Sequence, residues 1–118
     1  MNLLDEHLHT VVNPCWNYAG RSTTWDDRVM NAVCGLGGEA GEVVDLHKKF
    51  FFHTPEPYDV FQEKLKHEMG DLFFYAAKVL ELHGLTLEEV LAANKEKLQG
   101  RHPELGQVTE RFPEGYIR

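Results

Sequence analysis

Residues 35–45 read G-L-G-G-E-A-G-E-V-V-D, and this stretch shows the helical character of the chain best. Its two glutamates, Glu39 and Glu42, are three positions apart, which places both carboxylates on one face of a helix. Glu39 also continues a row of apolar residues at helical spacing: Val29, Ala32, Leu36, Val43, Leu46 and Phe50. A carboxylate on an inward row is costly unless something pairs with it. The stretch therefore predicts a helix that carries an acid in need of a partner.

Residues 66–75, K-H-E-M-G-D-L-F-F-Y, repeat this pattern with Glu68 and Asp71. Glu68 continues a second apolar row: Leu65, Leu72, Tyr75, Val79 and Leu82. Neither acidic pair lies on an obviously solvated face. Four carboxylates without His or Cys favour Mg²⁺, with Mn²⁺ as a substitute, over zinc or copper. The spacing alone also fits a plain acidic surface.

Two other interpretations of these motifs lack their structural context. A di-iron bundle needs two E-x-x-H motifs on core helices, and the chain has one, Glu6 to His9, near its N-terminus. Gly35, Gly37 and Ala40 match a dinucleotide-binding pattern, which requires a preceding strand. The segment before them, W-D-D-R-V-M-N-A-V, reads as an amphipathic helix instead.

The rest of the chain also follows a helical period, and strand-like alternation is nearly absent, so the fold class is predicted to be all-α. Thr24 can cap one helix and Gly84 can end another. Thr86 and Glu89 form a T-x-x-E capping box. The expected helices cover about 3–13, 24–51, 57–84 and 86–100, followed by a tail.

Composition narrows the possible partners. The length of 118 residues suits a single domain, 1–118. A net charge of −7 without a basic patch argues against a nucleic-acid polymer. No apolar run approaches a membrane span and no signal peptide is evident. Cys15 and Cys34 are expected to be reduced thiols in a cytoplasmic protein.

Five glycines lie inside the expected helices: Gly35, Gly37, Gly38, Gly41 and Gly70. Each weakens a helix by about 1 kcal/mol relative to Ala. The sequence leaves two explanations open, close approach of neighbouring helices or room for a ligand beside the carboxylates.

The last expected helix offers cations for a polyphosphate. Asn94, Lys97 and Arg101 are spaced i, i+3, i+7 and share one face. An acidic chain can bind a polyphosphate where metal ions or a few focused cations invert the local field. An ordinary solvated face explains the spacing equally well.

Taken together and in order, these motifs resemble the MazG-like all-α nucleoside triphosphate pyrophosphohydrolases. The shared pattern is E-x-x-E, then E-x-x-D, then N-x-x-K with a following Arg and Pro, over about residues 16–103. The resemblance implies a four- to five-helix bundle that works as an oligomer. It also implies Mg²⁺-dependent hydrolysis of an NTP or dNTP between the α and β phosphates, giving a monophosphate and pyrophosphate.

The resemblance also implies roles for single residues. The catalytic metal ligands would be Glu39, Glu42, Glu68 and Asp71. Contacts to the phosphates, sugar or base would come from Asn94, Lys97, Arg101, Tyr75 and Trp25, with Trp16 and Tyr18 as further candidates for stacking on the base. Arg111 or Arg118 could enter a neighbouring subunit's site.

The sequence is compatible with more than one oligomeric state and more than one function. A homodimer is the first expectation and a homotetramer the second, because so short a chain is not expected to cover the inward faces of four helices. One alternative function is a non-catalytic helical module that binds nucleotide or a protein. Another is hydrolysis of a different nucleotide diphosphate linkage.

Overall fold

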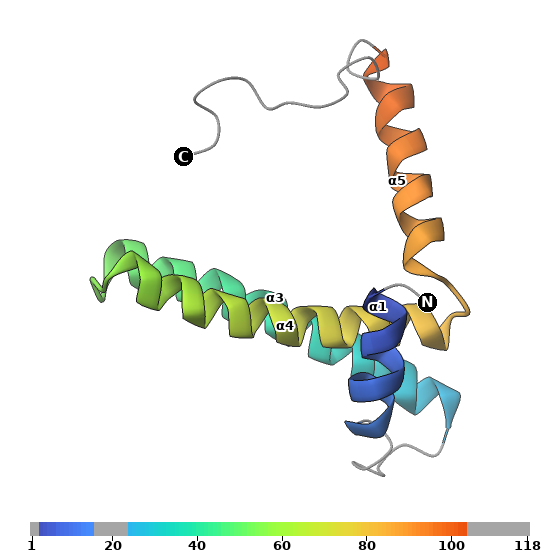
Figure 1. Cartoon of the computed structure of the whole chain (residues 1–118), viewed down its shortest axis with the longest axis horizontal. Helices are drawn as coiled ribbons and strands as arrows, with labels where there is room; N and C mark the ends of the chain where they lie inside the picture. Colours follow the sequence, from blue (N-terminus) through green and yellow to red (C-terminus); the bar gives the residue numbers. More distant parts are fainter. Residues whose placement is uncertain (1–2, 16–23, 104–118) are drawn as a thin grey trace. The chain divides into compact units, whose positions relative to one another are not determined.

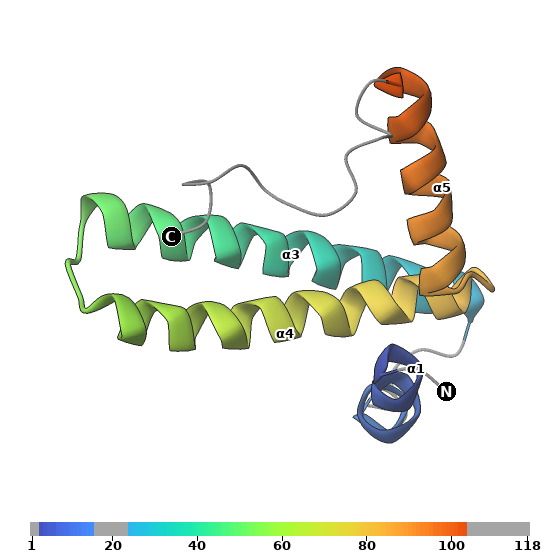
Figure 2. The ribbon, with the colours of Figure 1, turned by 45° about the horizontal axis from the view of Figure 1, so that its top comes forward.

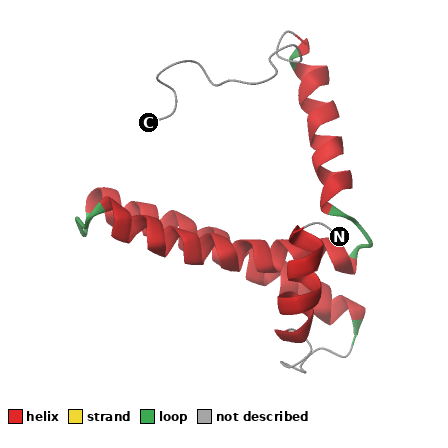
Figure 3. Cartoon of the chain, viewed as in Figure 1, coloured by secondary structure: helices red, strands yellow, loops and turns green. Residues whose placement is uncertain are grey.

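The computed structural model describes residues 3–15 and 24–103. These residues form helices and no strand, as Figure 3 shows, so the all-α prediction is confirmed. The elements in chain order are α1 (Leu3–His7), η1 (Leu8–Val12), α3 (Trp25–Phe52), α4 (Tyr58–Leu82) and α5 (Leu87–Arg101). None of the described helices is long and apolar enough to cross a membrane.

The chain divides into two compact units, Met1–Leu85 and Thr86–Arg118. The first contains α1, η1, α3 and α4, and the second contains α5. The single domain expected over 1–118 stays a prediction. The tail from residue 104 onward lies outside the described residues.

Both ends of α3 agree with the sequence-based prediction. Thr24 is the N-cap, and its hydroxyl oxygen accepts the backbone N–H of Asp27 at 3.1 Å. At the C-terminal end, the backbone N–H groups of His53 and Thr54 both donate to the carbonyl of Lys49, at 2.9 and 2.7 Å. The helix therefore stops just before the proline-containing connection to α4.

Local signals also set the limits of α4. Pro57 precedes its first residue, where a missing N–H costs nothing. After its last residue, Gly84 has a φ of +68°, a left-handed conformation that glycine adopts without strain. The N–H of Gly84 donates to the carbonyl of Glu81 at 3.0 Å, and that of Leu85 to Leu80 at 2.9 Å. These two bonds form a Schellman motif, which confirms the predicted role of Gly84.

The helices α3 and α4 form an antiparallel hairpin and lie side by side in Figures 1 and 2. Near the connection, Phe50 stacks on the buried Phe61 with ring centroids 4.3 Å apart, and His47 meets Phe61 edge-on at 5.0 Å. At the opposite end, the indole N–H of Trp25 donates to the carbonyl of Leu82 at 2.9 Å. Because both ends of the hairpin are held, residues in the middle of α3 face residues in the middle of α4.

The N-terminal helical segment packs against α4 through η1. A helix was predicted over 3–13, and its extent is confirmed, but the turn at Leu8–Val12 is a π-helix that the sequence did not indicate. There the backbone N–H of Asn13 donates to the carbonyl of Leu8, five residues back. This places Asn13 beside Lys78 and Glu81 of α4.

The capping box predicted for α5 is present. The side chain of Glu89 accepts the backbone N–H of Thr86 at 2.7 Å, and the hydroxyl oxygen of Thr86 accepts that of Glu89 at 3.2 Å. Two backbone donors that a helix leaves without partners are thereby satisfied, which fixes the start of α5 at Leu87.

Candidate functional site

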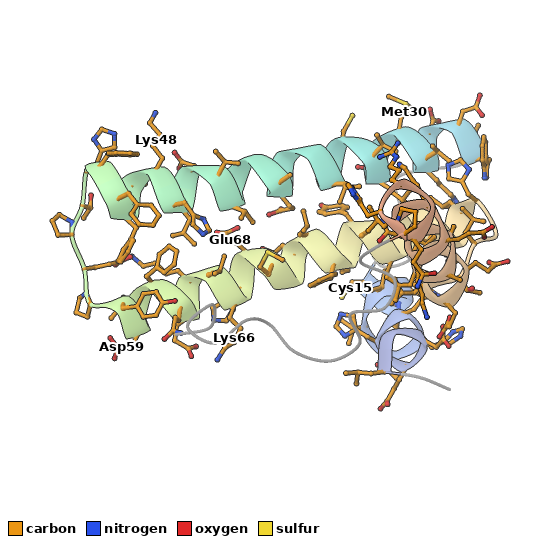
Figure 4. All side chains as sticks on the ribbon, turned by 90° about the horizontal axis from the view of Figure 1, so that it is seen from above. Cys15, Met30, Lys48, Asp59, Lys66 and Glu68 are labelled. Atoms are coloured by element: carbon orange, nitrogen blue, oxygen red, sulfur yellow. The ribbon has the colours of Figure 1, made fainter. Side chains whose placement is uncertain are left out.

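Three carboxylates meet midway along the hairpin. Glu39 comes from α3, and Glu68 and Asp71 come from α4; one carboxylate oxygen of each lies within 4.8 Å of the other two. Glu68 and Asp71 share a face because they are three residues apart, and the antiparallel pairing brings Glu39 opposite them. Figure 4 shows the side chain of Glu68 between α3 and α4. We call these three residues the acidic cluster.

The four predicted acids differ in their exposure. Glu39 and Glu68 are half-buried, as their inward rows predicted, whereas Glu42 and Asp71 are exposed. The expectation that neither pair lies on a solvated face therefore holds for one member of each pair. Side chains three positions apart on a helix point in directions that differ by about 60°. The second acid of each pair therefore lies closer to the edge of the face that it shares with the first. Glu42 lies outside the acidic cluster, whereas Asp71, which is also exposed, belongs to it.

The environment of Glu39 opposes its negative charge. Loss of solvation raises the pKa of Glu39, and the charges of Asp71, Glu68 and then Glu42 raise it further. The effect of Glu42 shows that its charge reaches the acidic cluster even though its carboxylate is not part of it. The cluster is thus a concentration of like charges that are only partly screened by water.

No Lys or Arg among the described residues forms an ion pair with the acidic cluster. Two lysines of the same helices are paired elsewhere, Lys49 with Asp45 at 2.8 Å and Lys66 with Glu63 at 2.7 Å. Figure 4 shows Lys66 pointing away from the hairpin. A partly buried set of carboxylate oxygens without a compensating cation fits a hard divalent metal ion such as Mg²⁺.

Tyr75 lies one turn after Asp71 and is half-buried. Its ring packs directly against Gly35 of α3, where an added Cβ would come within 2.6 Å of the ring carbon Cζ and nearer still to two other ring atoms. At the four other glycines of α3 and α4, such a Cβ would meet nothing within 4 Å: Gly37, Gly38, Gly41 and Gly70. Close helix approach therefore explains Gly35, and open space surrounds the others in the described part of the chain.

Trp25 lies far from the acidic cluster within one chain. Its ring is edge-on to His83 at 5.4 Å, and its side chain is bonded to Leu82 at the end of α4. Fourteen residues of α3 separate Trp25 from Glu39, about 21 Å at the rise of an α-helix. The predicted stacking of Trp25 on the base stays a prediction. Trp16 and Tyr18 lie outside the described residues.

The predicted phosphate-binding residues Asn94, Lys97 and Arg101 all lie on α5, in the second unit, and are exposed. Their spacing puts them on one face of this helix, as the sequence indicated. Their role beside the acidic cluster stays a prediction. Arg111 and Arg118 lie outside the described residues.

Comparison with known proteins identifies the family. The family model described as the MazG nucleotide pyrophosphohydrolase domain matches residues 30–106, well over half of the chain. The match contains the whole acidic cluster and α5. Searches of curated proteins and of solved structures gave no significant match. The family match and the all-helical fold agree with each other, and the chain therefore belongs to the MazG nucleotide pyrophosphohydrolase family.

Proposed function

We propose that this protein is a Mg²⁺-dependent hydrolase that cleaves nucleoside or deoxynucleoside triphosphates between the α and β phosphates. One water is consumed, and the products are a nucleoside monophosphate and pyrophosphate. The family implies nucleotide pyrophosphohydrolysis in general. The acidic cluster is the observation that supports metal dependence. Its three carboxylates come from two helices, one oxygen of each lies within 4.8 Å of the others, and no compensating cation is present among the described residues.

The acidic cluster would hold the metal ion through Glu39, Glu68 and Asp71, and Glu42 would add negative charge from the edge. A bound Mg²⁺ would neutralise phosphate charge and stabilise the charge that develops as the phosphate anhydride breaks. Such an ion also accounts for how a chain of net charge −7 binds a highly charged anion.

The remaining contacts to the substrate would come from two places. Asn94, Lys97 and Arg101, which share a face of α5, would bind the phosphates or the sugar. Tyr75 lies one turn from Asp71 and would pack against the sugar or base, and Trp25 would stack on the base. These assignments rest on the order of the family motifs along this chain.

We also propose that the protein is a homodimer or, as the second choice, a homotetramer. The hairpin leaves large apolar side chains exposed on the single chain, among them Met30, Val44 and Phe73, which are 59, 67 and 55% exposed. Apolar surface of this kind in one helical hairpin is typical of residues that a further subunit covers.

The test is product analysis of the pure protein with a panel of NTPs and dNTPs, with Mg²⁺ and with a chelator. We expect monophosphate and pyrophosphate, formed only in the presence of metal. Release of orthophosphate would place the cut at the terminal phosphate and contradict the proposal. Absence of turnover would favour a binding module or a different diphosphate substrate.

Substitution of a single carboxylate tests the site itself. Asp71→Asn keeps the shape of the side chain but removes a negative ligand, so we expect activity to fall by more than about 100-fold, the upper end of what outer-shell changes cost. Glu63→Gln is the matched control, because Glu63 lies on the same helix and pairs with Lys66 at the surface. Equal activity of the two variants would show that the acidic cluster is not the site.

A further inference from the structure

Among the helical glycines that the structure describes, Gly35 is the one whose Cβ position is occupied by another residue. The ring of Tyr75 occupies the place that a Cβ at position 35 would take, whereas Gly37, two residues further on, has nothing within 4 Å. A glycine in a helix interior weakens the helix. Because Gly35 has no side chain, the aromatic ring of Tyr75 on α4 can contact the backbone of α3 directly.

This contact lies one helical turn from the acidic cluster on both helices. Glu39 follows Gly35 by four residues, and Asp71 precedes Tyr75 by four residues. Because α3 and α4 are antiparallel, one turn forward along α3 and one turn back along α4 lead to the same level of the hairpin. The contact between Gly35 and Tyr75 therefore lies one helical turn along the hairpin from the level at which Glu39 and Asp71 meet.

A single metal ion held by these carboxylates tolerates little change in the distances between their oxygens. Mg²⁺ binds oxygen at about 2.1 Å, so two ligand oxygens on one ion are at most about 4.2 Å apart. The oxygens of the acidic cluster already lie within 4.8 Å of one another. The distance between packed helices depends on the side chains at the contact, and wider separation would carry Glu39 away from Glu68 and Asp71.

We propose that Gly35 is a positioning residue for the metal site: by seating the ring of Tyr75, it sets the separation of α3 and α4 at which the acidic cluster can bind one cation. This inference rests on the proposed function, since it assumes that the cluster holds a metal ion. Neither Gly35 nor the ring carbons of Tyr75 need to touch the ion for this role.

The test measures Mn²⁺ binding by electron paramagnetic resonance, without nucleotide, together with unfolding in urea. Gly35→Ala should bind Mn²⁺ about tenfold more weakly than the wild type, the size of an effect from outside the ligand shell. Gly37→Ala is the matched control and should bind as the wild type does, because its Cβ has open space. Tyr75→Phe keeps the ring and should also bind normally.

Rescue distinguishes positioning from general damage to the helix. In Tyr75→Leu the ring that a Cβ at position 35 would meet is gone, so adding Gly35→Ala should then cost little further Mn²⁺ affinity or urea resistance. Such non-additivity is the sign of direct coupling between two sites. Additive effects in both measurements would overturn the inference.

The outcomes separate this inference from the proposed function. If the wild-type protein does not bind Mn²⁺, the proposed metal site fails, and the positioning role fails with it. If the wild type binds and Gly35→Ala binds as well as Gly37→Ala, only the role of Gly35 is overturned. Weaker binding by Gly35→Ala with rescue by Tyr75→Leu supports both.

Discussion

At the scale of single residues, the surroundings of Glu39 oppose the ionisation of its carboxyl group. Loss of solvation and the charges of three other acids raise its pKa. A carboxyl group whose pKa is higher in the folded than in the unfolded protein destabilises the fold when it is ionised. The same arrangement that suits a cation therefore weakens the protein while no cation is bound.

Glu39→Gln should consequently make the metal-free protein more stable at neutral pH. The gain should shrink as the pH falls through the raised pKa of Glu39 toward the ordinary value of 4.5, because the wild-type side chain then becomes neutral as well. Urea unfolding of both proteins in chelator, at neutral and at acid pH, measures this difference.

The control for this prediction is Glu63→Gln. The side-chain hydrogen bond from Lys66 lowers the pKa of Glu63, so its charge stabilises the fold slightly and its removal should have the opposite sign. A loss of stability in Glu39→Gln at neutral pH would contradict the electrostatic description of the cluster.

The sequence could predict which acids share a helix face but not which of them meet. Spacing along the chain fixes the directions of Glu39 and Glu42 relative to each other. The exclusion of Glu42 from the cluster depends on how α3 is rotated against α4, which is a property of the pair of helices. For the same reason, spacing cannot distinguish the five glycines of the two helices from one another. Only the packing of α3 on α4 shows that Gly35 alone among them contacts a ring of the other helix.

At the scale of elements, helix ends were predictable because their signals are local. Caps at Thr24 and Thr86 and the left-handed residue at Gly84 act through backbone groups a few residues away. The π-turn at Leu8–Val12 was missed, since a shift from four- to five-residue hydrogen bonding leaves little trace in hydrophobic spacing.

Gly84→Ala tests the end of α4. A φ of +68° is costly for a residue with a Cβ, so we expect the substitution to destabilise the protein by about 1 kcal/mol or somewhat more. Gly84→Asn should cost less, because Asn tolerates this conformation. The free energy of unfolding in urea gives both values.

The control for Gly84 is a glycine in ordinary helical conformation. Gly37→Ala should stabilise the protein by up to about 1 kcal/mol, since Ala is the better helix former and its Cβ meets nothing within 4 Å. If both substitutions changed stability in the same direction, backbone conformation would not be the cause.

At the scale of the whole first unit, a polar triad around the buried Lys78 joins the N-terminal segment to α4. Lys78 is 6% exposed, and its ammonium group donates to Asn13 Oδ1 and Glu81 Oε1, both at 2.9 Å. The amide of Asn13 donates to the other carboxylate oxygen of Glu81 at 3.0 Å. Spacing along the chain does not reveal this triad, because Asn13 and Lys78 are 65 residues apart and meet only after η1 packs on α4.

The triad makes the attachment of the N-terminal segment depend on pH. Burial acts to raise the pKa of Glu81, but the hydrogen bonds from Asn13 and Lys78 outweigh it, and the pKa is lowered overall. A carboxylate with a lowered pKa stabilises the fold above its unfolded value and loses that contribution as the pH falls. The segment should therefore detach in acid before the hairpin unfolds.

Lys78→Met measures what this triad contributes. The variant leaves Asn13 and Glu81 without their shared donor, so we expect a loss of about 1–3 kcal/mol at neutral pH, typical of hydrogen bonds to charged groups. Amide hydrogen exchange should show faster opening in residues 3–15 than in the middle of α3. The difference from the wild type should narrow in acid, where Glu81 is protonated in both proteins.

Lys66→Met is the matched control, because Lys66 pairs with Glu63 of the same helix at 2.7 Å and the two side chains are 71 and 63% exposed. An exposed ion pair contributes less than about 1 kcal/mol, and its loss should leave exchange in the N-terminal segment unchanged. If Lys78→Met were no more destabilised than Lys66→Met, apolar contacts such as those of the buried Val12 would hold the segment to α4. In that case the acid-induced detachment should also disappear, since apolar contacts do not titrate.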